Sequence, residues 1–296
     1  MCDKLDRAAA AALLPLRDET GAKWRFGRTL LVCGSRDFSG AALLACESAL
    51  RSGAGLVQLA SVDAVIGSAR SRLPEALLLP LPESGDGKGV ISEGGAFALL
   101  RAAEKAQSLL FGCGLGISDD GRALLSRMAE AFPGPMVMDA DGLNLLAEDP
   151  SLLTRRPGPT VLTPHAGEFS RLTGLARDAS EAEAQAAASA FAKDFGVTLT
   201  LKGAQTLVTD GSRTLLLDAP NSGMAKGGAG DVLAGLAAGL VSQMPQDPFG
   251  AAALAVFVHA EAGMLARSAL GARGMLPSDV IARLPQAFLA LEAGQA

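Results

Sequence analysis

An aspartate behind a run of glycines is the residue of this chain best suited to chemistry. Asp231 directly follows the glycine-rich stretch 227–230, and from Val232 onward the chain is apolar and rich in alanine and leucine, which predicts a buried helix. Glycines ahead of a helix let backbone N–H groups approach an anion, and the helix N-terminus adds unpaired N–H groups and a positive dipole end. Phosphate is the anion expected there, and Asp231 is suited to take a proton from a hydroxyl that attacks it.

A capping role for Asp231 is the alternative, since acidic residues are common in a first helical turn. A bare Gly-Asp pair would favour the cap, whereas the three glycines ahead of Asp231 favour a binding site. We also expect the helix dipole and nearby N–H groups to keep this carboxylate ionised.

Alternating strand and helix patterns must position this segment. Apolar runs such as 28–33 and 108–112 predict buried strands, and amphipathic or apolar helices are expected between such runs. This alternation indicates a mostly parallel sheet covered by helices on both faces. Asp210-Gly211 between two apolar runs predicts a hairpin. The chain is expected to end in three helices near 230–243, 248–269 and 277–293.

Polar and glycine-rich clusters follow the expected strands, where ligands of such sheets bind. These clusters are GSRDFSG (34–40), GCGLG (112–116), DADGLN (139–144), TPHAGE (163–168), KGAQT (202–206) and GGAGD (227–231). In the cluster 139–144, Asp139, Asp141 and Asn144 are expected mainly to cap the end of a strand, and the alternative is that one of the two acids orients water or a metal.

Composition limits the function classes. The chain has 296 residues, 49% of them hydrophobic, and a net charge of −5 without a Lys/Arg run, which argues against nucleic-acid binding. Four scattered cysteines without a CxxC pair favour free thiols in a reducing cytoplasm. No apolar run is long enough to predict a membrane span. We expect residues 1–27 to form a helix and linker, and 28–296 a single domain.

Read in order, these clusters give the chain a clear family resemblance. It resembles the NAD(P)H-hydrate dehydratases, carbohydrate-kinase-like members of the ribokinase superfamily, from about Arg28 to the last helix. The matching segments are GSRDFSGAA (34–42), RSGAGLV (51–57), LPEALLLPL (73–81), GCGLG (112–116), MDADGLNLL (138–146), VLTPHAGEFSRLTG (161–174), LKGAQTLV (201–208) and NSGMAKGGAGDVLAG (221–235). The resemblance implies a ribokinase-like three-layer α/β/α sandwich.

The resemblance also implies a reaction. These enzymes are carbon–oxygen lyases that restore NADH or NADPH from the S epimer of NADHX or NADPHX, with ADP or ATP as donor and Mg²⁺ as cofactor. Hydroxide is a poor leaving group, so the C6 hydroxyl is first phosphorylated. The ring nitrogen then helps to expel phosphate.

Site residues follow from the same resemblance. Asp231 matches the substrate-contacting base, and Gly230 a nucleotide contact. The rest of the nucleotide set is Lys202, Gly203, Ala204, Gln205 and Thr206. The substrate set is Ala41, Gly114, His165 and Asp231.

For each of three residues, an ordinary structural role is the alternative to a role in the site. Lys202 is either a nucleotide contact or a surface lysine at a strand end. His165 is either a substrate contact or a hydrogen-bonded loop histidine. Glu168 is either near the metal or an acid in a first helical turn, and we rank these two equally.

Other residues are interpreted more plainly. His259 lies in an apolar helical stretch and is expected in the core, and Cys113 is expected to be a small apolar filler. Lys226 is expected either beside the phosphates or in solvent.

Two rival functions share these features. One is a small-molecule kinase of the same superfamily that acts on a vitamin alcohol, and the other is a non-catalytic nucleotide-binding module. TPHAGE and DADGLNLL favour the dehydratase over the kinase. The resemblance further implies a homotetramer. The R and S hydrates are expected to be interconverted by a separate epimerase or by spontaneous epimerisation.

Overall fold

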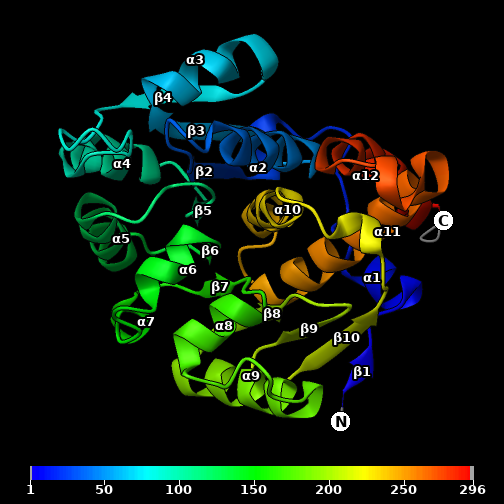
Figure 1. Cartoon of the computed structure of the whole chain (residues 1–296). Helices are drawn as coiled ribbons and strands as arrows, with labels where there is room; N and C mark the ends of the chain where they lie inside the picture. Colours follow the sequence, from blue (N-terminus) through cyan, green and yellow to red (C-terminus); the bar gives the residue numbers. More distant parts are fainter. Residues whose placement is uncertain (1, 294–296) are drawn as a thin grey trace.

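The computed structural model describes residues 2–293 and is built around one ten-stranded sheet (Figure 1). The strands are β1 (Asp3–Lys4), β2 (Arg28–Val32), β3 (Leu56–Val62), β4 (Leu77–Leu81), β5 (Ser108–Phe111), β6 (Met136–Met138), β7 (Thr160–Leu162), β8 (Thr198–Leu201), β9 (Gln205–Thr209) and β10 (Thr214–Asp218). Their order is β1-β10-β9-β8-β7-β6-β5-β2-β3-β4, and only β9 runs antiparallel to its neighbours. The expected mostly parallel sheet is therefore confirmed.

Helices cover the sheet on both faces. They are α1 (Arg7–Leu13), α2 (Ser39–Arg51), α3 (Asp63–Arg72), α4 (Ala96–Ala103), α5 (Asp119–Ala131), α6 (Asp141–Leu146), α7 (Leu152–Arg155), α8 (Ala166–Thr173), α9 (Glu181–Phe195), α10 (Ala229–Gln243), α11 (Pro248–Gly274) and α12 (Pro277–Glu292), with 3₁₀ turns η1 (Lys23–Phe26), η2 (Glu93–Gly95) and η3 (Ser222–Met224). In Figure 1, α2, α10, α11 and α12 lie on one side of the sheet and α4, α5, α8 and α9 on the other. This is the expected three-layer α/β/α arrangement.

Several local predictions are confirmed and some are wrong. The hairpin around Asp210-Gly211 joins β9 and β10, and α10, α11 and α12 are the three expected final helices. The N-terminal segment was expected to be a helix and linker, but its β1 pairs with β10 at the sheet edge. Short helices α6 and α7 were not expected.

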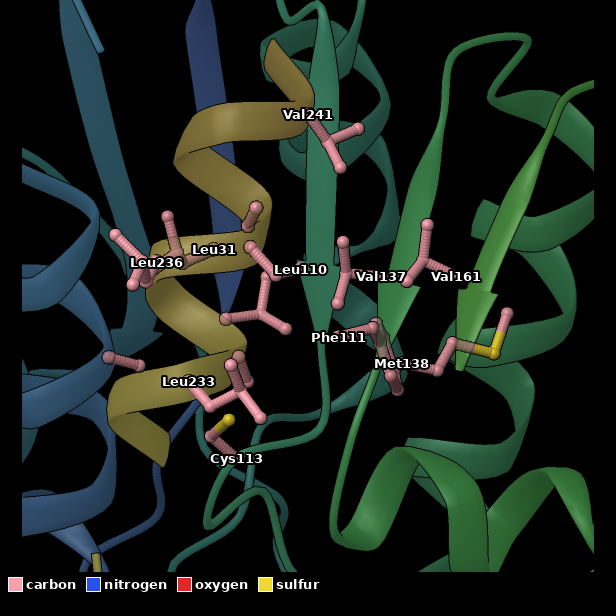
Figure 2. Close-up of a cluster of buried hydrophobic side chains, with 14 of the residues drawn as sticks. Leu31, Leu110, Phe111, Cys113, Val137, Met138, Val161, Leu233, Leu236 and Val241 are labelled. Atoms are coloured by element: carbon pink, nitrogen blue, oxygen red, sulfur yellow. The ribbon is translucent and has the colours of Figure 1, made fainter. Parts of the chain in front are cut away.

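Helix α10, which carries Asp231, is packed deep in the core. Figure 2 shows Leu233 and Leu236 of α10 facing Leu31 and Leu110 of the sheet. Gly235 lets α10 approach α2 closely, because a Cβ there would lie 2.0 Å from the Ala45 carbonyl oxygen. The N-terminus of α10 is therefore held at a fixed place above the sheet.

Helix α11 is long and apolar enough to cross a membrane by length and composition alone. In the most apolar 18-residue stretch of this helix, 72% is buried inside the protein. It contacts α10, α12 and strands β7 to β10, which is the environment of a core helix.

The order of the strands reverses where β5 lies beside β2. Both strands run parallel there, with Val32 opposite Phe111. In open α/β sheets, ligands bind at such a reversal, outside the carboxyl ends of the strands. The clusters that begin at Gly34 and Gly112 lie at this edge.

Candidate active site

A buried lysine pairs with two acidic groups at the carboxyl ends of β6, β7 and β8. The Nζ atom of Lys202 lies 2.6 Å from Oδ1 of Asp139 and 3.7 Å from Oε2 of Glu168. Burial alone would lower the pKa of Lys202, but these two carboxylates outweigh it and raise the pKa, so the ammonium stays charged. The surface-lysine alternative is wrong, because its side chain is only 18% exposed.

Asp139 was expected to cap the end of a strand, and this interpretation is wrong. Its Oδ1 accepts hydrogen bonds from Lys202 Nζ and, at 2.8 Å, from the Thr163 hydroxyl. The N-cap position of α6 is taken by Ala140, whose φ of +50° is costly for a residue with a Cβ. The backbone strain at Ala140 lies directly beside this carboxylate, as is common at functional sites.

Asp231 lies in the first turn of α10, beside Asp139 and Cys113. One oxygen of each carboxylate and the Cys113 sulfur all lie within 4.8 Å of one another. Burial, followed by the charge of Asp139, raises the pKa of Asp231 from 3.8 to about 6, although Cys113 and Lys202 pull it down. The expectation that the helix end keeps this group ionised is wrong in degree, because burial and a like charge outweigh the dipole. A carboxylate with a pKa of about 6 is well suited to act as a base near neutral pH.

Cys113 does more than fill space. Its thiol lies 3.9 Å from Oδ2 of Asp139, to which it donates, and the neighbouring Cys33 together with burial raises its pKa well above the usual value. It is therefore a protonated donor and not a thiolate nucleophile. Figure 2 places Cys113 near Leu233, close to the N-terminal end of α10.

Ala41 and Gly114, both expected at the substrate site, lie against each other. A Cβ on Gly114 would be 2.8 Å from the Ala41 methyl group and 2.8 Å from the Phe38 carbonyl oxygen, and its φ of +62° also favours glycine. The loop that carries Gly114 thus packs directly on the start of α2, next to Cys113.

His165 and Glu168 form a reciprocal cap on α8. The His165 Nδ1 accepts the Gly167 N–H at 2.9 Å, and Glu168 Oε2 accepts the His165 N–H at 2.8 Å. The hydrogen-bonded loop histidine and the first-turn acid are thus what the structure contains. The His165 side chain is still 55% exposed, so its ring has a free face. Substrate contact by His165 stays a prediction.

A cavity of about 740 Å³ lies beside this cluster, beyond the end of β8 and between β9, β10, η3, α10 and α11. Of the predicted nucleotide contacts, Lys202, Gly203, Ala204, Thr206 and Gly230 line it, and Gln205 does not. A cavity of this size suits a ligand as large as a nucleotide. Gly230 lies where the cavity meets the charged cluster, since a Cβ there would be 3.3 Å from Lys202 Nζ.

Sequence reasoning missed or misplaced three residues of this cavity. Lys226 Nζ donates to the carbonyls of Arg273 and Met275 at 2.8 and 2.5 Å, so it ties the glycine loop to the end of α11. Lys226 also lines the cavity, so its expected position beside the phosphates stays a prediction. His259 lines the cavity wall, so the expected core position is wrong in that respect. Asn221 lies in a segment quoted for the resemblance but was given no role. Only its position ahead of the glycine loop could have drawn attention to it.

Comparison with known proteins gives a consistent result. The family model described as NAD(P)H-hydrate dehydratase matches residues 29–286. The chain is 36% identical over 290 residues to the bifunctional NAD(P)H-hydrate repair enzyme Nnr of Moorella thermoacetica, covering 97% of this chain and 54% of that protein. It is 36% identical over 279 residues to the ADP-dependent (S)-NAD(P)H-hydrate dehydratase of Xanthomonas campestris, covering 94% and 93%.

A solved structure is similar as well. The ADP/ATP-dependent NAD(P)H-hydrate dehydratase from Bacillus subtilis, co-crystallized with ATP/Mg²⁺, matches with a TM-score of 0.82 at 27% identity, over 98% of this chain and 99% of that one. The chain spans about half the length of the bifunctional relatives it matches.

Proposed function

Because this chain belongs to the NAD(P)H-hydrate dehydratase family, we propose that it dehydrates (6S)-NAD(P)HX to NAD(P)H with ADP or ATP as phosphoryl donor. The observation that carries the proposal is the position of Asp231. Asp231 directly follows Gly230, which lines the nucleotide cavity. The pKa of the Asp231 carboxyl group is raised to about 6. A base is thus held next to the place where a terminal phosphate would end.

The chemistry proceeds in two steps. Asp231 accepts the proton of the C6 hydroxyl as that oxygen attacks the terminal phosphorus of the donor, and the bond to the shortened nucleotide breaks. The C6–O bond of the phosphorylated hydrate then breaks, phosphate leaves with the bonding electrons, and loss of a proton restores the dihydropyridine. The charge of Lys202 and the N–H groups at the start of α10 stabilise the transferring phosphoryl group.

The hydrated cofactor is proposed to lie on the opposite side of Asp231 from the nucleotide. Ala41 and Gly114 meet there, at the edge where β2 and β5 lie side by side. Neither residue lines the nucleotide cavity. His165 does line the nucleotide cavity, and we propose that the exposed face of its ring reaches from there toward the hydrate beside Asp231.

The predicted metal position does not fit Glu168 as a direct ligand. One oxygen of Glu168 accepts the His165 N–H, the other lies 3.5 Å from the His165 ring, and Lys202 is already its cationic neighbour. Mg²⁺ is often bound by substrate phosphates and few protein groups. We therefore propose that Mg²⁺ arrives with the nucleotide.

Partners and location complete the proposal. The substrate is (6S)-NAD(P)HX, and an epimerase that interconverts the R and S hydrates acts in the same pathway. We propose that the protein is a homo-oligomer and that it lies in the cytoplasm. The cytoplasmic location is consistent with the four free cysteines. A kinase acting on a vitamin alcohol is less well supported, because the family model and the relatives are named for the hydrate.

The test uses purified protein and (6S)-NADHX with ADP, ATP, AMP or no nucleotide. The absorbance of the NADH ring is expected to return with ADP or ATP and to stay absent with AMP. Equal rates with and without ADP and ATP would show that the proposed phosphorylation is not needed.

A further inference from the structure

The proposed base, Asp231, has no strong hydrogen-bond donor of its own. Within residues 2–293, no N–H or O–H group donates to its carboxylate. Lys202 acts on Asp231 through its charge alone, because its Nζ atom is hydrogen-bonded to Asp139. A partly buried carboxylate is costly to ionise unless donors satisfy its oxygens. Any donor that does reach Asp231 therefore bears directly on the base.

The thiol of Cys113 is, among the described residues, the side-chain donor placed to reach Asp231. The Cys113 sulfur and one oxygen each of Asp139 and Asp231 lie within 4.8 Å of one another. Hydrogen bonding with Cys33 and burial raise the pKa of Cys113 well above its usual value, so the thiol keeps its proton. Rotation about the Cβ–Sγ bond can point this one proton at either carboxylate.

The backbone around Cys113 holds the thiol in this place. The Gly112 N–H donates to the Val32 carbonyl at 3.1 Å, and the Cys113 carbonyl accepts the Gly34 N–H at 2.8 Å. A Cβ on Gly112 would lie 2.1 Å from the Asp139 carbonyl oxygen, so the loop packs directly on the segment that carries Asp139. The Cys113 side chain is fully buried. Water therefore does not compete with the carboxylates for the thiol proton.

Of the two carboxylates, Asp139 is already satisfied without the thiol. Its Oδ1 accepts Lys202 Nζ at 2.6 Å and the Thr163 hydroxyl at 2.8 Å. The thiol meets the other oxygen, Oδ2, across 3.9 Å, which is long for a hydrogen bond. The ammonium of Lys202 compensates the charge of Asp139, whereas an ionised Asp231 has no such partner in contact. The thiol proton is therefore worth more to Asp231 whenever that group is charged.

We propose that Cys113 is a positioning residue for the base, an inference that rests on the proposed function. Its thiol donates to one oxygen of the ionised Asp231 and leaves the other oxygen free for the C6 hydroxyl. Once Asp231 has taken the hydroxyl proton, the thiol turns back to Oδ2 of Asp139, as it lies in the structure. No bond to sulfur forms or breaks in this exchange, so the thiol is not consumed.

The charged and titratable groups around Asp231 set the sign of the expected effect. Burial, and then the charge of Asp139, raises the pKa of Asp231. The hydrogen bond from Cys113, followed by the charge of Lys202, lowers this pKa, and Asp141 adds a smaller upward effect. Removing the thiol proton therefore raises the pKa of Asp231. The base then stays protonated up to a higher pH.

The test measures the pKa of Asp231 in the full chain by carbon NMR of protein labelled at aspartate, beside the pH profile of kcat/KM. The Asp231 signal is assigned by its loss in Asp231→Asn. Cys113→Ala and Cys113→Val both remove the donor. We expect either variant to raise the pKa and the acidic limb by about 0.5 to 1 pH unit, which makes kcat/KM about 3- to 10-fold lower at pH 5. At pH 8, where Asp231 is ionised in all proteins, kcat/KM should fall by less than about 3-fold.

Two further variants separate the donor from the volume of the side chain. Cys113→Ser restores a donor, so the pKa of Asp231 should return to within about 0.3 unit of wild type. Cys46→Ala is the matched control, because Cys46 is a fully buried thiol on α2. It should leave the Asp231 pKa and the pH profile unchanged. Calorimetry should give the same ADP dissociation constant for all of these proteins.

The outcomes separate this inference from the proposed function. An Asp231 pKa that does not rise in Cys113→Ala and Cys113→Val, or a rise that Cys113→Ser does not reverse, overturns the thiol contact. A rise by NMR without a matching shift of the pH profile overturns the positioning role. If one donor-free variant does not fold, the other decides, and failure of both to fold assigns Cys113 to packing and overturns the proposal. If the wild-type protein makes no NADH with ADP or ATP while the NMR shifts are as expected, the proposed function fails and the thiol contact stands.

Discussion

Replacing Asp231 with asparagine should inactivate the protein and stabilise its fold at the same time. The folded pKa of about 6 lies above the ordinary 3.8, so the ionised carboxylate is unfavourable in the folded state. Its cost is absent below pH 3.8, grows as the pH rises through 6, and is complete at pH 7. At about 1.4 kcal/mol per pKa unit, this cost is on the order of 1 to 3 kcal/mol. Asparagine keeps the shape and removes the charge, so the free energy of unfolding should rise by about that amount.

The same substitution removes the proposed base. We expect the turnover rate to fall by about 10²-fold or more, while the dissociation constant of ADP stays equal or falls. Wild-type kcat/KM should decline as the pH falls through 6 and be roughly tenfold lower at pH 5 than at pH 8. The measurements are urea unfolding at pH 7, calorimetry with ADP and steady-state kinetics.

A matched control separates the base from a simple helix cap. Asp63 is an exposed acid in the first turn of α3. Asp63→Asn should lower the free energy of unfolding by about 0.5 kcal/mol and leave activity unchanged. If Asp231→Asn is also destabilised and loses activity only by unfolding, Asp231 is a cap and the reasoning on its burial is refuted.

Three further substitutions test the surroundings of Asp231. Lys202→Met should weaken ADP binding more than hydrate binding. It should also shift the acidic limb of the kcat/KM profile to higher pH, because Lys202 lowers the pKa of Asp231. An unchanged ADP affinity in calorimetry would show that Lys202 is not part of the nucleotide site. His165→Ala should mainly raise the KM for the hydrate and lower the free energy of unfolding by about 1 kcal/mol, because the cap of α8 is lost. If kcat instead fell as much as in Asp231→Asn at unchanged KM, His165 would be the base and Asp231 the residue that orients the hydrate. Gly235→Ala should destabilise the fold by about 1 to 3 kcal/mol in thermal unfolding, because the added methyl group would clash with the Ala45 carbonyl. An unchanged melting temperature would mean that α2 and α10 can move apart without cost.

The sequence was sufficient for the layers of the fold because the central strands of the sheet are buried. Ser108–Phe111, for example, is buried on both faces, as expected for a parallel sheet between helix layers. It was not sufficient for β1, where two exposed residues join the sheet only through pairing with β10. Local patterns indicated α8 only through the first-turn alternative for Glu168, because the N-terminal cap of this helix combines a histidine and a glutamate.

The candidate site shows the same division between local and long-range information. The proposed nucleotide segment could be predicted because its residues are contiguous, and Asp231 could be predicted because glycines precede it. The partner of Lys202 was missed, because Asp139 is 63 residues away and comes near only through the parallel pairing of β6, β7 and β8. The pKa of Asp231 was misjudged for a related reason, since its burial and the nearby Asp139 charge are properties of the packed structure.

The central claim is that phosphoryl transfer from the nucleotide drives dehydration, and product stoichiometry tests it most directly. Wild-type protein is mixed with (6S)-NADHX and excess ADP, and AMP, phosphate and NADH are quantified by chromatography as the reaction proceeds. We predict one AMP and one phosphate for each NADH formed, and the formation of neither above background with Asp231→Asn. NADH that accumulates without matching AMP would contradict the account.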